Sequence, residues 1–209
     1  MSATTLAPRA IAIVDDDDAV RDALSLLLRM QGFATRDFAS GESFLAWARD
    51  EPVDCVLLDL KMTGLSGLEV QAALAERGLA WPVVMLTAHG DVATTRAALK
   101  AGAFDFIEKP FDDVLLLRTI RAATDASVSM RDKAERKARF ARDLDRLTPR
   151  EREVLSHVLA SRHNREIAAL LDISPRTVEV HKARVMDKLG VDRLPDLIRL
   201  ALEMGLGNE

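Results

Sequence analysis

Five short runs of strand-forming residues alternate with five segments of helical spacing over residues 8–125, and this alternation constrains the fold more than any other feature. The strand-forming runs are 10–14, 33–38, 56–59, 83–87 and 104–107. The helical segments are 19–30, 40–48, 68–77, 91–101 and 112–123. Parallel strands require crossover connections of this kind, and the crossovers are right-handed. We therefore predict a doubly wound α/β domain whose five-stranded parallel sheet has the order 2-1-3-4-5.

Polar side chains follow the ends of these expected strands. Asp15 and Asp16 come after the first run, Asp59 ends the third, Thr87 ends the fourth, and Lys109 follows the fifth. The carboxyl ends of parallel strands meet at one edge of a sheet, where open α/β sheets bind their ligands. A run of consecutive aspartates is usually a solvated helix start. The arrival of all these side chains at one edge nevertheless favours a functional site.

Clustered carboxylates beside a lysine suit phosphoryl chemistry. The carboxylates repel one another and are stabilised by a hard divalent cation with oxygen ligands. Mg²⁺ keeps several waters and is commonly bound through one or two carboxylates beside a phosphate. Asp59 would be the nucleophile that forms an aspartyl-phosphate. Thr87 would donate its hydroxyl to a phosphoryl oxygen, and Lys109 would offset charge in the transition state.

The charge balance changes along the chain and suggests two modules with different partners. Residues 1–127 contain 12 Lys and Arg against 19 Asp and Glu, whereas residues 128–209 contain 17 against 14. Between the modules, residues 126–145 carry many charges and no Pro or Gly. We predict that they form an exposed helical linker that continues the preceding helix, supported by charge pairs along its surface.

Four short helices are expected in residues 146–209. A capping box begins the first at Thr148, and further starts lie at Asn164, Ser174 and Pro195. Short helices with a tight turn before the third are typical of a helix-turn-helix bundle. One side of the third helix suits a DNA major groove, because cations flank small or polar residues there. Its residues are Arg176, Glu179, Val180, Lys182, Ala183, Arg184 and Lys188.

Four motifs at the expected carboxyl edge resemble the signature of a two-component receiver domain. They are Val14-Asp15-Asp16, Leu58-Asp59, Leu86-Thr87-Ala88 and Ile107-Glu108-Lys109-Pro110-Phe111. The resemblance implies that a sensor histidine kinase phosphorylates Asp59. It also implies that Mg²⁺ is bound by Asp16 and Asp59, by Asp15 through water, and by the main-chain carbonyl of Lys61.

The same resemblance implies a cis peptide bond before Pro110 and a switch in which Thr87 moves toward the phosphoryl group while Phe106 turns inward. It further implies a symmetric homodimer through the face made by the fourth helix, fifth strand and fifth helix. The family usually has proline after the Met of the loop that follows Asp59, whereas here Thr63 takes that place. We expect a less rigid loop and an altered phosphate lifetime, without loss of a catalytic group.

Three motifs in the basic half resemble the LuxR/FixJ-type output domain, so the whole chain resembles a FixJ-class response regulator. The motifs occupy 147–151, 164–168 and 173–181. The resemblance implies that Glu179, Val180 and Ala183 face DNA bases. It implies that Arg176, Thr177, Lys182 and Lys188 hold the DNA backbone. Arg184 stands where the family often has Asn, so it would strengthen a phosphate contact or change the base preference.

These features predict a phosphorylation-activated, DNA-binding transcriptional regulator in three segments. The segments are a receiver domain at 8–125, a helical linker at 126–145 and a LuxR-type helix-turn-helix domain at 146–209. The expected partners are a sensor histidine kinase, double-stranded promoter DNA, RNA polymerase and, on phosphorylation, a second copy of the chain. No apolar run approaches the ~20 residues of a membrane span, so we expect a cytoplasmic protein without membrane contact. We do not expect an enzyme beyond the receiver's own phosphoryl transfer and dephosphorylation.

Two alternative functions remain open. A phosphatase of the haloacid-dehalogenase type also uses a strand-end Asp, but it carries a second Asp two residues later, where this chain has Lys61. A regulator that works unphosphorylated, gated by a ligand or partner protein, is the other alternative. The complete set of polar residues at the carboxyl edge disfavours it. The single cysteine, Cys55, allows no internal disulfide and is expected to be a buried, inert thiol.

Overall fold

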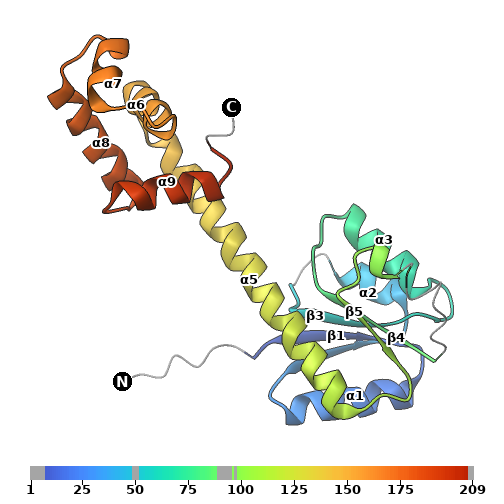
Figure 1. Ribbon diagram of the computed structural model, residues 1–209. Coiled ribbons are helices and arrows are strands. Elements are labelled where there is room, and N and C mark those ends of the chain that lie inside the picture. The colour runs from blue at the N-terminus through green and yellow to red at the C-terminus, as the bar shows by residue number, and fades with distance from the viewer. Residues whose placement is uncertain (1–7, 49–51, 89–95, 97, 207–209) are drawn as a thin grey trace. The chain divides into compact units, whose positions relative to one another are not determined.

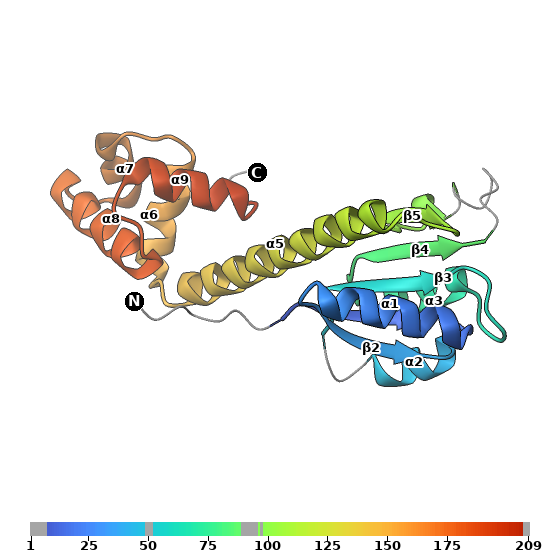
Figure 2. The same ribbon diagram turned by 90° about the horizontal axis from the view of Figure 1, so that it is seen from below.

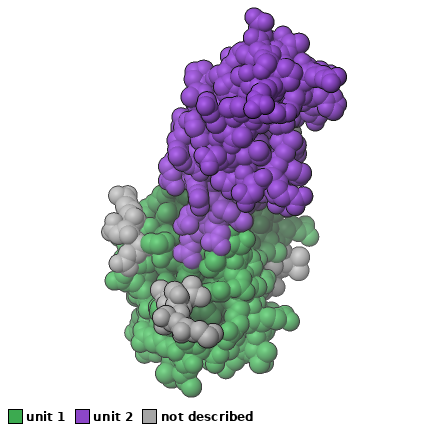
Figure 3. Space-filling model, turned by 90° about the vertical axis from the view of Figure 1, so that its left-hand side faces the viewer, with its two compact units in different colours: residues 1–130 green, residues 131–209 purple. Residues whose placement is uncertain are grey.

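The computed structural model describes residues 8–48, 52–88, 96 and 98–206 of the chain. The chain divides into two compact units, Met1–Met130 and Arg131–Glu209, which are coloured separately in Figure 3. We call them the first and second units.

A five-stranded sheet of order β2-β1-β3-β4-β5, parallel throughout, forms the centre of the first unit. The predicted fold class and strand order are therefore confirmed. The register pairs Asp59 with Leu86 and Thr87 with Glu108, so the carboxyl ends of the three strands that carry them lie level. The strands are β1 (Ala10–Val14), β2 (Ala34–Phe38), β3 (Cys55–Asp59), β4 (Val83–Thr87) and β5 (Asp105–Glu108).

Helices cover both faces of this sheet (Figures 1 and 2). The helices α1 (Asp18–Met30) and α5 (Asp113–Asp145) lie over one face, and α2 (Gly41–Trp47) and α3 (Gly67–Glu76) lie over the other. Neighbouring residues of β3 serve the two faces, since Leu57 packs in the core under α1 and α5 while Leu58 packs under α2 and α3. Both faces of β3 and β4 are thus buried, which explains their continuous apolar sequences.

The helix expected between β4 and β5 is described only in part. Residues 96 and 98–100 are helical, and Ala98 is buried in the core shared with α2 and α3. Asp91, the expected cap of this helix, lies outside the described residues. Residues Arg96, Lys100 and Arg118, which belong to the expected dimer face, are exposed.

Local sequence signals set the helix starts beside the carboxyl edge. Asp17 caps α1 by accepting a hydrogen bond from the Ala19 N–H at 2.9 Å, so it is an ordinary helix start. Ser66 forms a capping box with Glu69 at the start of α3. Gly67 is required there, because a Cβ atom at this position would lie 2.5 Å from the carbonyl oxygen of Asp59.

The helix α5 continues without a break for 33 residues, as the linker prediction requires. Leu116 and Ile120 are buried in the core of the first unit, and residues 131–139 are exposed. Phe140, however, is only 5% exposed and packs in a core of the second unit. The expectation that the whole linker is exposed is therefore wrong at Phe140 and also at Ser127, which is buried. No described helix, α5 included, is both long and apolar enough to cross a membrane.

The second unit is a bundle of short helices built on two small cores. Val185 and Leu197 pack around Phe140 in one core, while Val154, Ile167 and Val178 form the other. The capping box predicted at Thr148 is present, and Ser174 caps the third of the four short helices. Their bounds are α6 (Pro149–Leu159), α7 (Asn164–Leu171), α8 (Pro175–Leu189) and α9 (Leu194–Glu203).

Candidate functional site

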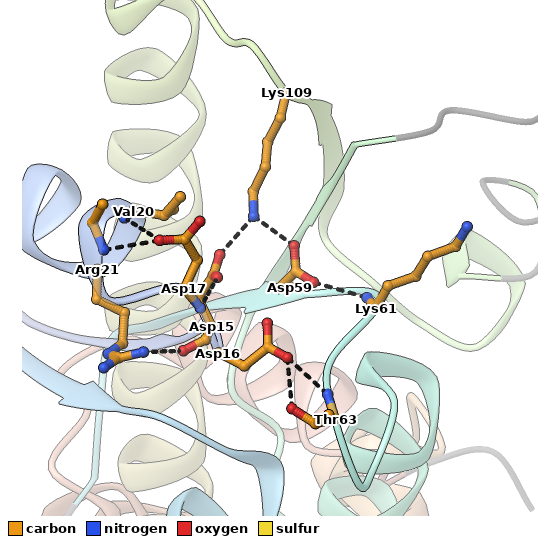
Figure 4. Close-up of polar contacts among 10 residues, drawn as sticks. Asp15, Asp16, Asp17, Val20, Arg21, Asp59, Lys61, Thr63 and Lys109 are labelled. Carbon is orange, nitrogen blue, oxygen red and sulfur yellow. Dashed lines mark hydrogen bonds and ion pairs between the residues drawn. The ribbon is translucent and has the colours of Figure 1, made fainter.

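Two buried carboxylates share one ammonium group at the carboxyl edge of the sheet (Figure 4). Asp15 follows β1 and is 1% exposed, and Asp59 ends β3 and is 6% exposed. The Nζ atom of Lys109, which follows β5, donates a hydrogen bond of 2.6 Å to each of them. Three residues distant in the sequence therefore meet as predicted, and the lysine links the ends of three strands.

Backbone amides hold the remaining oxygens of these two carboxylates. Asp15 Oδ1 accepts a hydrogen bond from the Asp17 N–H at 3.0 Å, and Asp59 Oδ2 accepts one from the Lys61 N–H at 2.9 Å. The side chain of Lys61 extends away from the cluster in Figure 4, so only its main chain lies at the site. Asp59 is consequently fixed from two sides, by the ammonium of Lys109 and by the turn that follows its own strand.

Asp16 is exposed and is held by Thr63. The Thr63 N–H and hydroxyl donate to the same oxygen, Asp16 Oδ2, at 2.8 and 2.7 Å. These two hydrogen bonds lower the pKa of Asp16, because they favour its charged form. We expected a looser loop where proline is replaced, but Thr63 anchors this loop to Asp16 across 47 positions of sequence.

Burial and the shared lysine act in opposite directions on the ionisation of Asp59. Burial raises the pKa of Asp59, since it disfavours the charged carboxylate, and the hydrogen bond from Lys109 opposes this effect. Burial also works against the charged form of Lys109, but hydrogen bonds to Asp15 and Asp59 outweigh it and raise the Lys109 pKa. The ammonium is therefore held charged beside a carboxylate with a raised pKa.

The other predicted residues of this part of the sheet lie on β4 and β5 or directly after them. Thr87 is buried at the end of β4, and its carbonyl oxygen accepts a hydrogen bond of 2.6 Å from the Lys109 N–H. The peptide bond between Lys109 and Pro110 is cis, as expected. Phe106 on β5 is half-buried and packs against the core shared with α2 and α3.

The donor set fits a hard divalent cation. Asp15, Asp16 and Asp59 bring three carboxylates to the edge, whereas Lys109 supplies a single positive charge among them. Among the described residues, no three carboxylate, imidazole or thiol side chains form a metal-binding group by themselves. The expected ligands instead combine two carboxylates with the Lys61 carbonyl and water, a composition that suits Mg²⁺.

A second candidate surface lies on α8. Val178, Val185 and Leu189 are buried and fix the inner side of this helix. The outer side presents mainly exposed residues, so it is open to a binding partner. The predicted DNA-contacting residues that are exposed are Arg176, Glu179, Val180, Ala183 and Arg184.

Lys188 does not belong to this outer surface. Its Nζ atom lies 2.6 Å from Glu151 Oε2 on α6 and donates a second hydrogen bond of 3.0 Å to the Arg146 carbonyl oxygen. Glu151 is 2% exposed, so this is a largely buried ion pair. We therefore withdraw the expectation that Lys188 holds the DNA backbone, because its ammonium is already needed to compensate a buried carboxylate.

Two other predicted backbone contacts are engaged within the second unit. The Lys182 Nζ atom donates to Asn164 Oδ1 at 3.0 Å, and the Asn164 amide reaches Glu179 at 3.5 Å. Thr177 is half-buried and donates its N–H to the Ser174 side chain. Asn164 thus links α7 to two residues of the outer surface of α8, so it orients Lys182 and Glu179.

Sequence reasoning overlooked several contacts that the fold creates. The hydroxyl of Thr63 is the one sequence signal for its contact with Asp16. The capping box explains one role of Glu151, but its pairing with Lys188 joins residues 37 positions apart. Arg21 donates to the Asp15 carbonyl oxygen at 2.7 Å, and no motif points to that contact. Helical spacing gave no signal for these three contacts.

Comparison with known proteins places both units in established families. Residues 11–121 match the response regulator receiver domain, and residues 145–201 match the bacterial regulatory proteins of the luxR family. The chain is 43% identical to the transcriptional regulatory protein FixJ of Rhizobium meliloti, over 94% of this chain and 97% of FixJ. It is 39% identical to the transcriptional regulatory protein TdiR of Thauera aromatica, over 92% of this chain and 85% of TdiR.

Solved structures of response regulators agree with these matches. The structure of the response regulator StyR is similar to this one, with a TM-score of 0.81 and 36% sequence identity. The match covers 94% of this chain and 100% of the StyR chain. Full-length FixJ from B. japonicum has a TM-score of 0.60 and 36% identity, covering 96% of this chain and 98% of FixJ. The chain therefore belongs to the response regulators, as a FixJ-like transcriptional regulator that joins a receiver domain to a LuxR-type DNA-binding domain.

Proposed function

We propose that this regulator is activated by phosphorylation of Asp59. A sensor histidine kinase is the proposed donor, and double-stranded promoter DNA is the proposed target. The observation that carries the proposal is the position of the Lys109 ammonium, 2.6 Å from both Asp15 and Asp59. A positive charge held between two buried carboxylates at the carboxyl edge is suited to stabilise a phosphoryl group on one of them.

The proposed transfer is a displacement at phosphorus. A carboxylate oxygen of Asp59 forms a bond to phosphorus as the bond between phosphorus and the imidazole nitrogen of the donor breaks. Lys109 then exchanges part of its contact with the carboxylates for a phosphoryl oxygen, and the Thr87 hydroxyl donates to another. Asp16, Asp59 and the Lys61 carbonyl would hold Mg²⁺ with Asp15 acting through water, and the ion would neutralise charge on the phosphoryl oxygens.

The proposed output couples this added charge to dimerisation. A phosphoryl group brings about −1.5 to −2 charge and three acceptor oxygens, which favours movement of Thr87 toward it. Phe106 would turn inward as Thr87 moves, and Arg96, Lys100 and Arg118 would lie in a two-fold interface. The paired chains would present α8 to promoter DNA in the cytoplasm and engage RNA polymerase there.

Dimerisation and DNA binding driven by a small phosphodonor test this function. The full-length chain is treated with acetyl phosphate and Mg²⁺, and its mass in solution and its retention of genomic DNA fragments are measured. We expect dimers and enriched promoter fragments for the wild type, and neither gain for Asp59→Asn. If Asp59→Asn dimerises as fully as the wild type, Asp59 is not the acceptor. A wild type that binds its promoters equally well without phosphodonor would favour the phosphorylation-independent alternative.

A further inference from the structure

Thr63 makes a pair of contacts that no proline could make at its position. Its N–H and its hydroxyl both donate to Asp16 Oδ2, at 2.8 and 2.7 Å. Proline lacks the N–H and has no side-chain donor that could replace the Thr63 hydroxyl. The two hydrogen bonds therefore depend on this residue's identity as well as on the path of the loop.

The contacts fix one oxygen of Asp16 and leave the other available. Both donors reach Oδ2, and the second oxygen is turned toward the Asp59 side of the cluster in Figure 4. Asp16 is exposed and would otherwise be free to rotate. Immobilising such a side chain on binding costs conformational entropy. Thr63 removes that cost by ordering Asp16 in advance.

The donors of Thr63 are neutral, so they orient Asp16 without weakening the attraction of the cluster for a cation. Lys109 differs in this respect, because its ammonium lies 2.6 Å from Asp15 and Asp59 and competes with a cation for their charge. Outer partners that orient a metal ligand in this way are known to affect metal affinity strongly.

We propose that Thr63 is a positioning residue for the divalent cation, and that it holds Asp16 so that its second oxygen is presented to Mg²⁺. This inference rests on the proposed function, since it assumes that Asp16 is a ligand of the ion. On this inference, the loop that contains Thr63 is anchored to Asp16, whereas the sequence suggested a looser loop. Thr63 strengthens the metal site by supplying two hydrogen bonds to Asp16.

Mg²⁺ titration of full-length variants by isothermal calorimetry tests the inference without any measurement of phosphorylation. Thr63→Val keeps the N–H and the shape but loses the hydroxyl, and we expect it to bind Mg²⁺ about tenfold more weakly. Thr63→Pro loses both donors and should bind more weakly still. Thr63→Ser keeps both donors and should match the wild type. Thr35→Val is a matched control, because Thr35 lies on β2 away from the carboxyl edge, and its Oγ1 accepts hydrogen bonds from Ser25 and Arg29 of α1.

The outcomes separate this inference from the proposed function. Weaker binding by Thr63→Val with full affinity in Thr63→Ser and Thr35→Val supports the positioning role. Affinity in Thr63→Val equal to that of the wild type, or higher, overturns it while leaving the proposed metal site intact. A wild type that binds no Mg²⁺ overturns both. Thermal unfolding in the presence of a chelator verifies that each variant is folded, so a loss of affinity is not a loss of structure.

Discussion

Replacing Lys188 by methionine should destabilise the second unit instead of removing a DNA contact. Lys188 on α8 forms a hydrogen bond of 2.6 Å with Glu151 on α6, and Glu151 is 3% exposed in its side chain. Methionine keeps most of the aliphatic chain but removes the ammonium. The carboxylate of Glu151 would then remain buried without its opposite charge, which is among the costly defects in a folded protein.

The pKa of Glu151 gives the magnitude of this effect. The hydrogen bond from Lys188 is the largest cause that lowers the Glu151 pKa from 4.5 to about 2, and donors on Thr148 add to it. Since one pKa unit corresponds to about 1.4 kcal/mol, the whole shift corresponds to about 3 kcal/mol. The Lys188 side chain is 27% exposed, so water screens part of the interaction. We expect Lys188→Met to lower the free energy of unfolding of the second unit by about 2 kcal/mol.

The effect should depend on pH in a defined direction. Because the folded-state pKa of Glu151 is depressed, its contribution is fully present above about pH 4.5 and is lost as the pH falls toward about 2. The difference in stability between the wild type and Lys188→Met should therefore be constant near neutral pH and shrink in acid. A difference that grows on acidification would contradict this origin.

Two optical signals can assign the loss to the second unit in the intact chain. Both tryptophans, Trp47 and Trp81, lie in the first unit, so their fluorescence follows that unit alone. We expect urea unfolding followed by tryptophan fluorescence to be unchanged in Lys188→Met, while part of the circular dichroism transition moves to lower urea. Arg184→Met, an exposed cation on the same helix, is the matched control and should stay within about 0.5 kcal/mol of the wild type.

A double-mutant cycle with Glu151→Gln isolates the pair. We expect the effect of Lys188→Met to be much smaller in the Glu151→Gln background, since no buried charge then remains to be compensated. One result would refute the reasoning. Lys188→Met could instead unfold like the wild type and reduce the slope of log K against log salt for DNA binding by the amount expected for one lost phosphate contact. Lys188 would then face DNA, as first expected from the sequence.

Three further predictions concern the two candidate surfaces. Arg184→Gln should weaken binding to all DNA sequences and flatten the slope of log K against log salt by about 1 if Arg184 contacts phosphate, without a change in stability; an unchanged slope would exclude the contact. Gly67→Ala should destabilise the first unit by about 1–3 kcal/mol in urea unfolding, because its Cβ would lie 2.5 Å from the Asp59 carbonyl oxygen; wild-type stability would contradict that close approach. Lys109→Met should slow phosphorylation of Asp59 by acetyl phosphate about a hundredfold in a mass-spectrometric time course, and a wild-type rate would exclude a role for its charge.

Patterns that repeat along one segment were the ones that sequence reasoning could use. Buried strands and helices of regular spacing gave the sheet order, and the order alone brought Asp15, Asp59 and Lys109 to one edge. The capping box at Thr148 is a local feature, so it also follows from spacing. Such features depend on residues a few positions apart.

Contacts between distant elements could not be predicted in this way. Lys188 lies three residues after Val185, at the border between the buried and exposed sides of α8, and only the packing of α6 decides which side it takes. Phe140 is different, because Leu144 and Leu147 follow it at helical spacing and share its core, so the sequence did carry a signal for this burial. Thr63 reaches Asp16 because a loop folds back over 47 positions, and spacing says nothing about that path.

The covalent state of Asp59 is the most direct measurement of how this regulator works. The full-length chain is incubated with acetyl phosphate, with and without Mg²⁺, and its peptides are mapped by mass spectrometry. We predict a phosphoryl group on Asp59 that requires Mg²⁺ and is absent from Asp59→Asn. A phosphoryl group on another residue, or none on any peptide while Mg²⁺ is present, would contradict activation through this carboxylate.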